Sequence, residues 1–349
     1  ESEKVKNAVK YLTKVLEALG AEVKKIDKHT WSVCCANVKE TEIPCDMAKK
    51  IRASILFAGP LLARLGKVVM MPPGGDVIGR RRLDTHFLAL TELGARVDID
   101  GKFVFIANKL VGEDIFLDET SVTGTENALM AAVLAEGKTI ITNAASEPHV
   151  QDLCNMLNAM GAKITGIGSN ILHIEGVKKL HGCEFTIGPD YMEIGSFIGL
   201  AAATKGSIRI EKVNPSDMRP LRIAFSKLGI RWAINGNTLE VPQGQEMRVN
   251  TDLGGQIPKI DDSPWPGFPP DLTSIMTVVA TQVDGNVLIF EKRSRRGRST
   301  QPSLDHFRNR RDRHSAGIDR RKPWPNGGGR RACLRSPCGG SASVLSILS

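Results

Sequence analysis

Long apolar runs are missing from this chain of 349 residues. The longest lies near residues 194–203, whereas a helix that crosses a membrane needs about 20 apolar residues. We therefore expect no membrane span. Aromatic residues make up only 5% of the chain, so the core must rest mainly on Leu, Ile, Val, Ala and Met. No basic and then apolar leader follows Glu1, and we expect the natural protein to begin upstream of it.

The seven cysteines lack the paired C-x-x-C spacing of zinc sites. Their number is odd, so they cannot all pair in disulfides within one chain. Reduced thiols are the simpler interpretation, and they are typical of a cytoplasmic protein.

The net charge of +9 comes from one end of the chain. Residues 293–349 contain thirteen Arg and one Lys against three Asp, a net charge of +11, which leaves −2 on residues 1–292. The main part of the protein therefore has no excess of positive charge with which to hold nucleic acid.

A unit of helix, glycine and hairpin occurs four times along the chain. Apolar residues at helical spacing lead each time to a glycine that is expected to stop the helix. A strand, a polar turn and a second strand follow, as in residues 95–99 and 103–106. The four stops are Leu19-Gly20-Ala21, Leu93-Gly94-Ala95, Met160-Gly161-Ala162 and Leu228-Gly229-Ile230.

A second helix with its own glycine completes each unit. The first set of glycines is spaced by 74, 67 and 68 residues, and the second set by 71, 69 and 79. Such self-similarity indicates a repeated supersecondary unit. We predict an α/β protein in which these units close into a pseudo-symmetric domain rather than an open solenoid. The second set comprises Gly66, Gly137, Gly206 and Gly285.

The second helices share a register. Fourteen residues before their glycines lie Arg52, Thr123, Met192 and Asp271, at or near the helix N-termini. Unpaired N–H groups and the helix dipole favour anions at such ends. Plainer interpretations stay open, because Thr123 with Glu126 fits a capping box and Asp271 could cap its helix. Arg52 could belong to a solvated basic face.

A segment rich in glycine and arginine, residues 73–84, follows the apolar run at 68–71. It places Asp76 between Gly75 and a triple arginine that includes Arg81 and Arg82. Arginine grips phosphate and carboxylate oxygens two at a time. An acid on a glycine-rich loop beside such a clamp suits proton transfer to a bound anion. The alternative is a surface turn whose charges are solvated.

Six segments carry a resemblance to a known family. They are residues 52–55, 73–84, 121–123, 134–137, 143–148 and 268–271. Together they resemble the UDP-N-acetylglucosamine 1-carboxyvinyltransferases, which are enolpyruvyl transferases, over about residues 5–292. The resemblance implies an inside-out α/β barrel in two domains, with three units per domain and the active site between the domains.

The reaction that this resemblance implies is the first committed step of peptidoglycan synthesis. The enolpyruvyl group of phosphoenolpyruvate moves to the 3-hydroxyl of UDP-N-acetylglucosamine, and phosphate is released. The resemblance implies small-molecule substrates, a cytoplasmic location, and no metal or organic cofactor. We expect no membrane partner.

The resemblance also implies roles for individual residues. Asp271 matches the base that takes the sugar hydroxyl proton, and Asp76 matches the acid that protonates the substrate methylene. Many family members have cysteine at the Asp76 position, where a covalent epoxide antibiotic attacks the thiol. Arg52 and Arg81 match residues that grip anionic groups. The substrate site would comprise Arg52, Arg81, Arg82, Leu83, Asp84, Thr85, Glu119, Thr120, Ser121, Val122, Thr123 and Asp271, with Ile289 near the sugar.

Two parts of the family pattern are missing from the sequence. A Lys-Asn pair that helps to hold phosphoenolpyruvate would precede Glu1, and the pattern stops at residues 290–292. We interpret residues 293–349 as coding sequence translated out of frame. The alternatives are a disordered basic tail and an RNA-binding arm. The nucleotide sequence after the Lys292 codon would decide, because a correct frame should encode another helix–glycine–hairpin unit.

We accordingly divide the chain into three parts. Residues 1–187 form a first domain of three units, the first of which lacks its start. Residues 188–292 begin a second domain with one unit, and residues 293–349 are the tail. On the frame interpretation, the second domain lacks two units and the C-terminal arginines of the family.

Two other functions stay open from the sequence. The first is the shikimate-pathway enolpyruvyl transferase, against which the Asp-bearing glycine loop argues. The second is a noncatalytic protein that binds nucleic acid through residues 293–349. Its RNA binding would be sensitive to salt and would disappear when those residues are removed.

Overall fold

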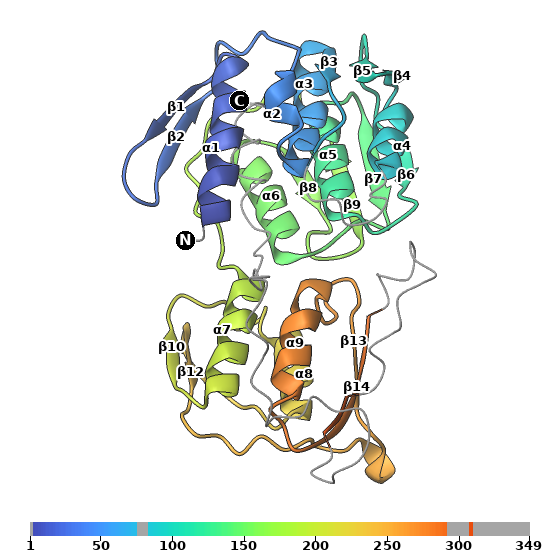
Figure 1. The fold of residues 1–349 in the computed structure, drawn as a ribbon. Helices are drawn as coiled ribbons and strands as arrows, with labels where there is room; N and C mark the ends of the chain where they lie inside the picture. The colour runs from blue at the N-terminus through green and yellow to red at the C-terminus, as the bar shows by residue number, and fades with distance from the viewer. Residues whose placement is uncertain (1–2, 75–82, 292–306, 310–349) are drawn as a thin grey trace. The chain divides into compact units, whose positions relative to one another are not determined.

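The computed structural model describes residues 3–74, 83–291 and 307–309 of the chain. These residues divide into two compact units. Unit 1 comprises the described residues up to 188 together with 264–266, and unit 2 comprises 189–263 and the described residues from 267 onwards. Both units combine helices with small sheets (Figure 1). The predicted α/β class is confirmed.

The first repeat lies in unit 1 and begins with α1 (Glu3–Ala18). The apolar residues at helical spacing, Leu12, Val15, Leu16 and Leu19, are fully buried. The repeat continues with the hairpin β1 (Glu22–Lys25) and β2 (Trp31–Cys34), α2 (Cys45–Ala48), the 3₁₀ helix η1 (Arg52–Phe57), α3 (Ala58–Leu65) and β3 (Lys67–Met70).

The second repeat also has a helix, a hairpin, a second helix and a last strand, but strand β6 takes the place of α2 and η1. It consists of α4 (Asp84–Glu92), β4 (Arg96–Asp100), β5 (Lys102–Ile106), β6 (Asp114–Phe116), α5 (Val122–Ala132) and β7 (Lys138–Thr142). The third repeat runs from unit 1 into unit 2. Its elements are α6 (Pro148–Ala159), β8 (Lys163–Thr165) and β9 (Ile171–Glu175) in unit 1, and α7 (Tyr191–Thr204) and β10 (Ile208–Ile210) in unit 2.

The fourth repeat lies in unit 2. It consists of α8 (Arg219–Lys227), β11 (Ala233–Asn235), β12 (Thr238–Val241), η2 (Leu253–Gly255), β13 (Lys259–Asp261), η3 (Pro270–Leu272), α9 (Thr273–Ala280) and β14 (Gly285–Phe290). Strand β15 (Phe307–Asn309) pairs antiparallel with β14. It is the only described part of the predicted tail at residues 293–349.

Successive repeats are joined through their sheets. The last strand of one repeat pairs antiparallel with the hairpin of the next, as β3 with β5, β7 with β9 and β10 with β12. Short strands also run parallel to the last strand of their own repeat, as β6 beside β7 and β13 beside β14. The resulting sheets have the orders β3-β5-β4, β6-β7-β9-β8, β10-β12-β11 and β13-β14-β15.

All four predicted stops of the first helices are confirmed. Gly20, Gly94, Gly161 and Gly229 have φ between 75° and 100°, a region that favours glycine. The residue after each glycine donates its N–H to the carbonyl five positions earlier, at 2.9–3.1 Å. This bond is the signature of the Schellman motif. In the second set, it is Lys205, the residue before Gly206, that takes the left-handed conformation, with φ 55°.

The interior of unit 1 is organised around α5, which is buried from Gly124 to Ala132. Helix α3 packs beside it (Figure 1). Gly59 lies at the point of closest approach, since a Cβ there would lie 2.4 Å from the carbonyl oxygen of Asn127. This packing fixes the start of α5 relative to η1 and α4. None of the helices in the described ranges is long and apolar enough to cross a membrane.

Candidate active site

The described candidate residues of unit 1 lie at the starts of three helical segments. Arg52 begins η1, Asp84 begins α4, and Val122 begins α5. Helix α5 packs against both η1 and α4. The shared register of the second helices is confirmed, because residues 52, 123, 192 and 271 are the first or second residues of η1, α5, α7 and η3.

The other predicted residues are not among the described residues of unit 1. Asp76, Arg81 and Arg82 lie outside the described residues. Asp271 and Ile289 belong to unit 2. Asp271 is exposed in η3, whereas Ile289 is buried in β14.

The residues before α5 are held by local hydrogen bonds. Glu119 is exposed, and its carbonyl accepts the Ser121 N–H at 2.8 Å. The Thr120 hydroxyl donates to Asn143 Oδ1 at 2.8 Å. The backbone of Asn143 has a left-handed conformation, with φ 61°. These contacts fix the chain that enters α5.

Ser121, not Thr123, caps α5. The Ser121 Oγ accepts the Gly124 N–H at 3.2 Å, and the Ser121 backbone is extended, as expected of an N-cap residue. The capping-box interpretation of Thr123 is therefore wrong. Its backbone already lies inside the helix, and its hydroxyl contacts the side chain of His86 instead.

The first turn of α4 is anchored to the segment before α5. The Thr85 hydroxyl donates to Asp118 Oδ1 at 2.7 Å. Its methyl group faces Gly124, where a Cβ would lie 2.8 Å from Thr85 Cγ2. Leu83, at the N-cap position of α4, is buried, and Asp84 is half-buried. The starts of α4 and α5 are thus in direct contact.

His86 and Asn127 are site residues that the sequence patterns did not single out. His86 Nε2 lies 3.2 Å from Thr123 Oγ1, and His86 Nδ1 lies 3.0 Å from Asn127 Nδ2. Both side chains are almost fully buried, at 2% and 0% exposure. They join α4 to α5 directly beneath Thr123.

The imidazole of His86 is neutral in this environment. Burial lowers the pKa of His86 from 6.5 to about 3, and the nearby positive charge of Arg52 contributes to this lowering. A buried cation without a paired anion is costly, so His86 keeps a single ring proton. Arg52 is half-buried at the start of η1, which packs against α5.

We expect His86 to lower the free energy of unfolding as the pH decreases through a defined range. The unfolded chain binds a proton on His86 below pH 6.5, whereas the folded chain binds one only near pH 3. The free energy of unfolding should therefore drop as pH falls through this range, by about 2 kcal/mol at pH 5. In His86→Gln, the decrease in the free energy of unfolding between pH 7.5 and pH 5, measured by urea denaturation, should be smaller by about that amount. The exposed His173 supplies the control His173→Gln, and an equal change in both variants would contradict the prediction.

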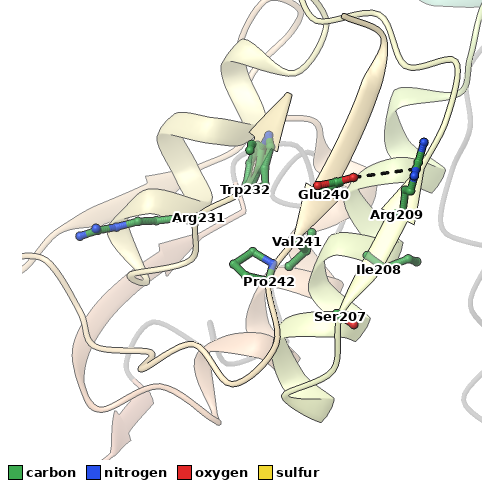
Figure 2. Close-up of a pocket in the computed structure, with 9 residues that line it drawn as sticks. Ser207, Ile208, Arg209, Arg231, Trp232, Glu240, Val241 and Pro242 are labelled. Atoms are coloured by element: carbon green, nitrogen blue, oxygen red, sulfur yellow. Dashed lines mark ion pairs between the residues drawn. The ribbon is translucent and has the colours of Figure 1, made fainter. Parts of the chain in front are cut away.

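A cavity of about 520 Å³ lies elsewhere, in unit 2 (Figure 2). It is lined by β10, β12 and residues 231–233, and it contains none of the predicted site residues. Its Arg209 and Glu240 form an ion pair at 3.9 Å, and both are exposed. We therefore do not assign the chemistry to this cavity.

The described residues offer no metal centre. No group of three or more His, Cys, Asp or Glu side chains with the arrangement of a metal site occurs within them. Their five cysteines form no disulfide; they are Cys34, Cys35, Cys45, Cys154 and Cys183. Burial raises the pKa of Cys154 to about 12, which disfavours its nucleophilic thiolate form.

Comparison with known proteins identifies the family. The sequence model of the protein family EPSP synthase (3-phosphoshikimate 1-carboxyvinyltransferase) matches residues 7–304. The chain belongs to the enolpyruvyl transferase family. A UDP-N-acetylglucosamine 1-carboxyvinyltransferase of Treponema denticola is 72% identical over 281 residues, which cover 80% of this chain and 66% of the relative. One of Borreliella burgdorferi is 54% identical over 287 residues, covering 82% and 67%.

A solved enolpyruvyl transferase has the same fold. NikO from Streptomyces tendae matches with a TM-score of 0.68 at 20% identity, over 81% of this chain and 66% of NikO. The predicted family and the fold class are thus confirmed. The chain spans about two thirds of the length of the curated relatives that it matches.

Proposed function

We propose that this enolpyruvyl transferase moves the enolpyruvyl group of phosphoenolpyruvate to the 3-hydroxyl of UDP-N-acetylglucosamine. The observation that carries the proposal is the 72% identity to a relative with that name. We extend the proposal to its cellular role, the first committed step of bacterial peptidoglycan synthesis in the cytoplasm. The cysteines of the described residues form no disulfide, which agrees with a reducing compartment.

The proposed reaction is an addition followed by an elimination. The sugar oxygen loses its proton to Asp271 and bonds to C2 of phosphoenolpyruvate, while Asp76 protonates the C3 methylene. The adduct then loses a proton from the new methyl group to the Asp76 carboxylate as the bond from C2 to the phosphate oxygen breaks. The enol ether and inorganic phosphate are the products. Both carboxyl groups act as general acid or base.

The starts of η1, α4 and α5 supply the proposed binding site for the nucleotide. The N–H groups at the start of α5 and the charge of Arg52 favour phosphate there. Arg81 and Arg82 are proposed to add a bidentate grip on anionic groups. Thr85 and Ser121 support this site through the bonds that fix α4 and α5.

Phosphate release with two acceptors tests the proposal. We expect the protein to release phosphate from phosphoenolpyruvate when UDP-N-acetylglucosamine is present, and not with shikimate 3-phosphate in its place. Equal or faster release with shikimate 3-phosphate would assign the protein to the other branch of the family. A colorimetric assay for inorganic phosphate measures both reactions.

We predict that the protein resists the epoxide that inactivates cysteine-bearing relatives. A carboxylate is a much weaker nucleophile than a thiolate, so Asp76 should not be alkylated. Activity after incubation with the epoxide should stay within experimental error of the untreated sample, whereas Asp76→Cys should be inactivated with time. Loss of activity with a covalent adduct on Asp76, detected by mass spectrometry, would contradict the prediction.

A further inference from the structure

A buried chain of hydrogen bonds lies beneath the start of α5. It runs from the backbone of α3 through Asn127 and His86 to the hydroxyl of Thr123. Asn127 and His86 are buried, whereas Thr123 is half-buried. The direction of each bond in this chain can be worked out from its fixed end.

The orientation of the Asn127 amide is set by a backbone donor. The Gly59 N–H can only donate, and it lies 2.7 Å from Asn127 Oδ1. The oxygen is therefore the acceptor, and Nδ2 must face the other way. From there Nδ2 donates to the Ile55 carbonyl at 2.9 Å.

The amide then selects the tautomer of His86. The Asn127 amide nitrogen Nδ2 can donate hydrogen bonds but cannot accept them. At 3.0 Å it therefore donates to His86 Nδ1. A neutral imidazole that accepts at Nδ1 carries its proton on Nε2. That N–H consequently donates to Thr123 Oγ1 at 3.2 Å.

The hydroxyl of Thr123 is left with a proton to donate. It accepts from His86, so its own O–H must point away from the imidazole. Ser121 already serves as the cap, and within the described part of the chain no other side-chain hydrogen bond is assigned to Thr123. Arg52 begins η1, which packs against α5, and its positive charge favours an anionic acceptor.

We infer that His86, whose tautomer is set by Asn127, is a positioning residue that holds the Thr123 hydroxyl as a hydrogen-bond donor to a phosphate oxygen of the sugar nucleotide. The inference rests on the proposed function for its ligand. Its structural part, the Nε2–H tautomer, does not depend on the ligand. The two parts are tested separately.

The tautomer is read from the imidazole nitrogens. A long-range ¹H–¹⁵N correlation spectrum of the full chain should show His86 protonated at Nε2 and unprotonated at Nδ1. A proton on Nδ1, or a doubly protonated ring at pH 7, would overturn the inference whatever the protein binds. His86→Gln assigns the signals.

The effect on the ligand is read from UDP-N-acetylglucosamine binding by calorimetry. Thr123→Val, which removes the hydroxyl and keeps the shape, should raise the Kd about tenfold or more, since a hydrogen bond to a charged group is lost. His86→Leu should raise it severalfold. Thr123→Ser and His86→Gln keep a donor at each place and should bind within about threefold of the parent.

The double variant separates positioning from general damage. If His86 acts through Thr123, His86→Leu should have no further effect on the Kd in the Thr123→Val background. Multiplying effects, or full affinity in His86→Leu, would overturn the inference while the proposed function stands. A parent protein that does not bind the nucleotide would overturn both. His86→Gln keeps the test decisive if His86→Leu fails to fold.

Discussion

Replacing Asp271 with asparagine is expected to lower kcat by about 10²- to 10⁴-fold, the usual contribution of a general base. The amide has nearly the same shape but cannot take the proton of the sugar hydroxyl. Asp271 is exposed in η3, after the rigid Pro269 and Pro270, and asparagine fills the same space. The variant should therefore fold normally, with KM for both substrates changed little. Initial rates of phosphate release measure the effect.

A matched control isolates the role of this carboxylate. Asp284 is an exposed aspartate of the same unit, and Asp284→Asn should keep the parent kcat. If Asp271→Asn also kept it, Asp271 would not be the base. A rise in KM at constant kcat would instead assign Asp271 to binding.

Gly59→Ala is expected to destabilise unit 1 by about 3 kcal/mol, the sum of overpacking and a lost buried hydrogen bond. The new Cβ would lie 2.4 Å from the Asn127 carbonyl oxygen and 2.6 Å from Asn127 Oδ1. The backbone atom cannot rotate away, so α3 and α5 must separate. That movement also breaks the Gly59 N–H bond to Asn127. Alanine favours helix by about 1 kcal/mol over glycine, which does not offset these losses.

The control for this substitution is Gly182→Ala. Gly182 is exposed, and a Cβ there meets nothing within 4 Å, so its free energy of unfolding should change by no more than about 0.5 kcal/mol. Urea denaturation followed by circular dichroism compares the two variants. Equal stability of Gly59→Ala and the parent would show that α3 and α5 do not approach as closely as described.

The repeats were predictable because their signals are local. A helix that ends in a Schellman motif needs glycine at one position and an apolar pattern before it, and both are visible in one stretch of sequence. Four helices and the hairpins after them were therefore predicted from Gly20, Gly94, Gly161 and Gly229. Gly206 shows the limit of such local signals, because the neighbouring Lys205, and not the glycine, adopts the left-handed conformation there.

The support of the candidate site was not predictable, because it depends on contacts between distant segments. His86 and Asn127 are 41 residues apart, and neither belongs to a recognisable local motif. Thr123 fits a capping box by spacing, but Ser121 two residues earlier takes the cap. Thr123 is then free to bond with His86 on another helix. Only the packing of α4 on α5 shows that the Ser121 hydroxyl caps the helix and that the Thr123 hydroxyl bonds to His86.

The most direct test of the central claim is to identify the product by NMR. The protein is incubated with phosphoenolpyruvate and UDP-N-acetylglucosamine, and ³¹P and ¹H spectra are recorded over time. We predict that inorganic phosphate and the vinyl protons of an enol ether on the sugar 3-oxygen grow in equal amounts. Phosphate that appears without the enol ether, or a mixture that stays unchanged while the nucleotide is bound, would contradict the account.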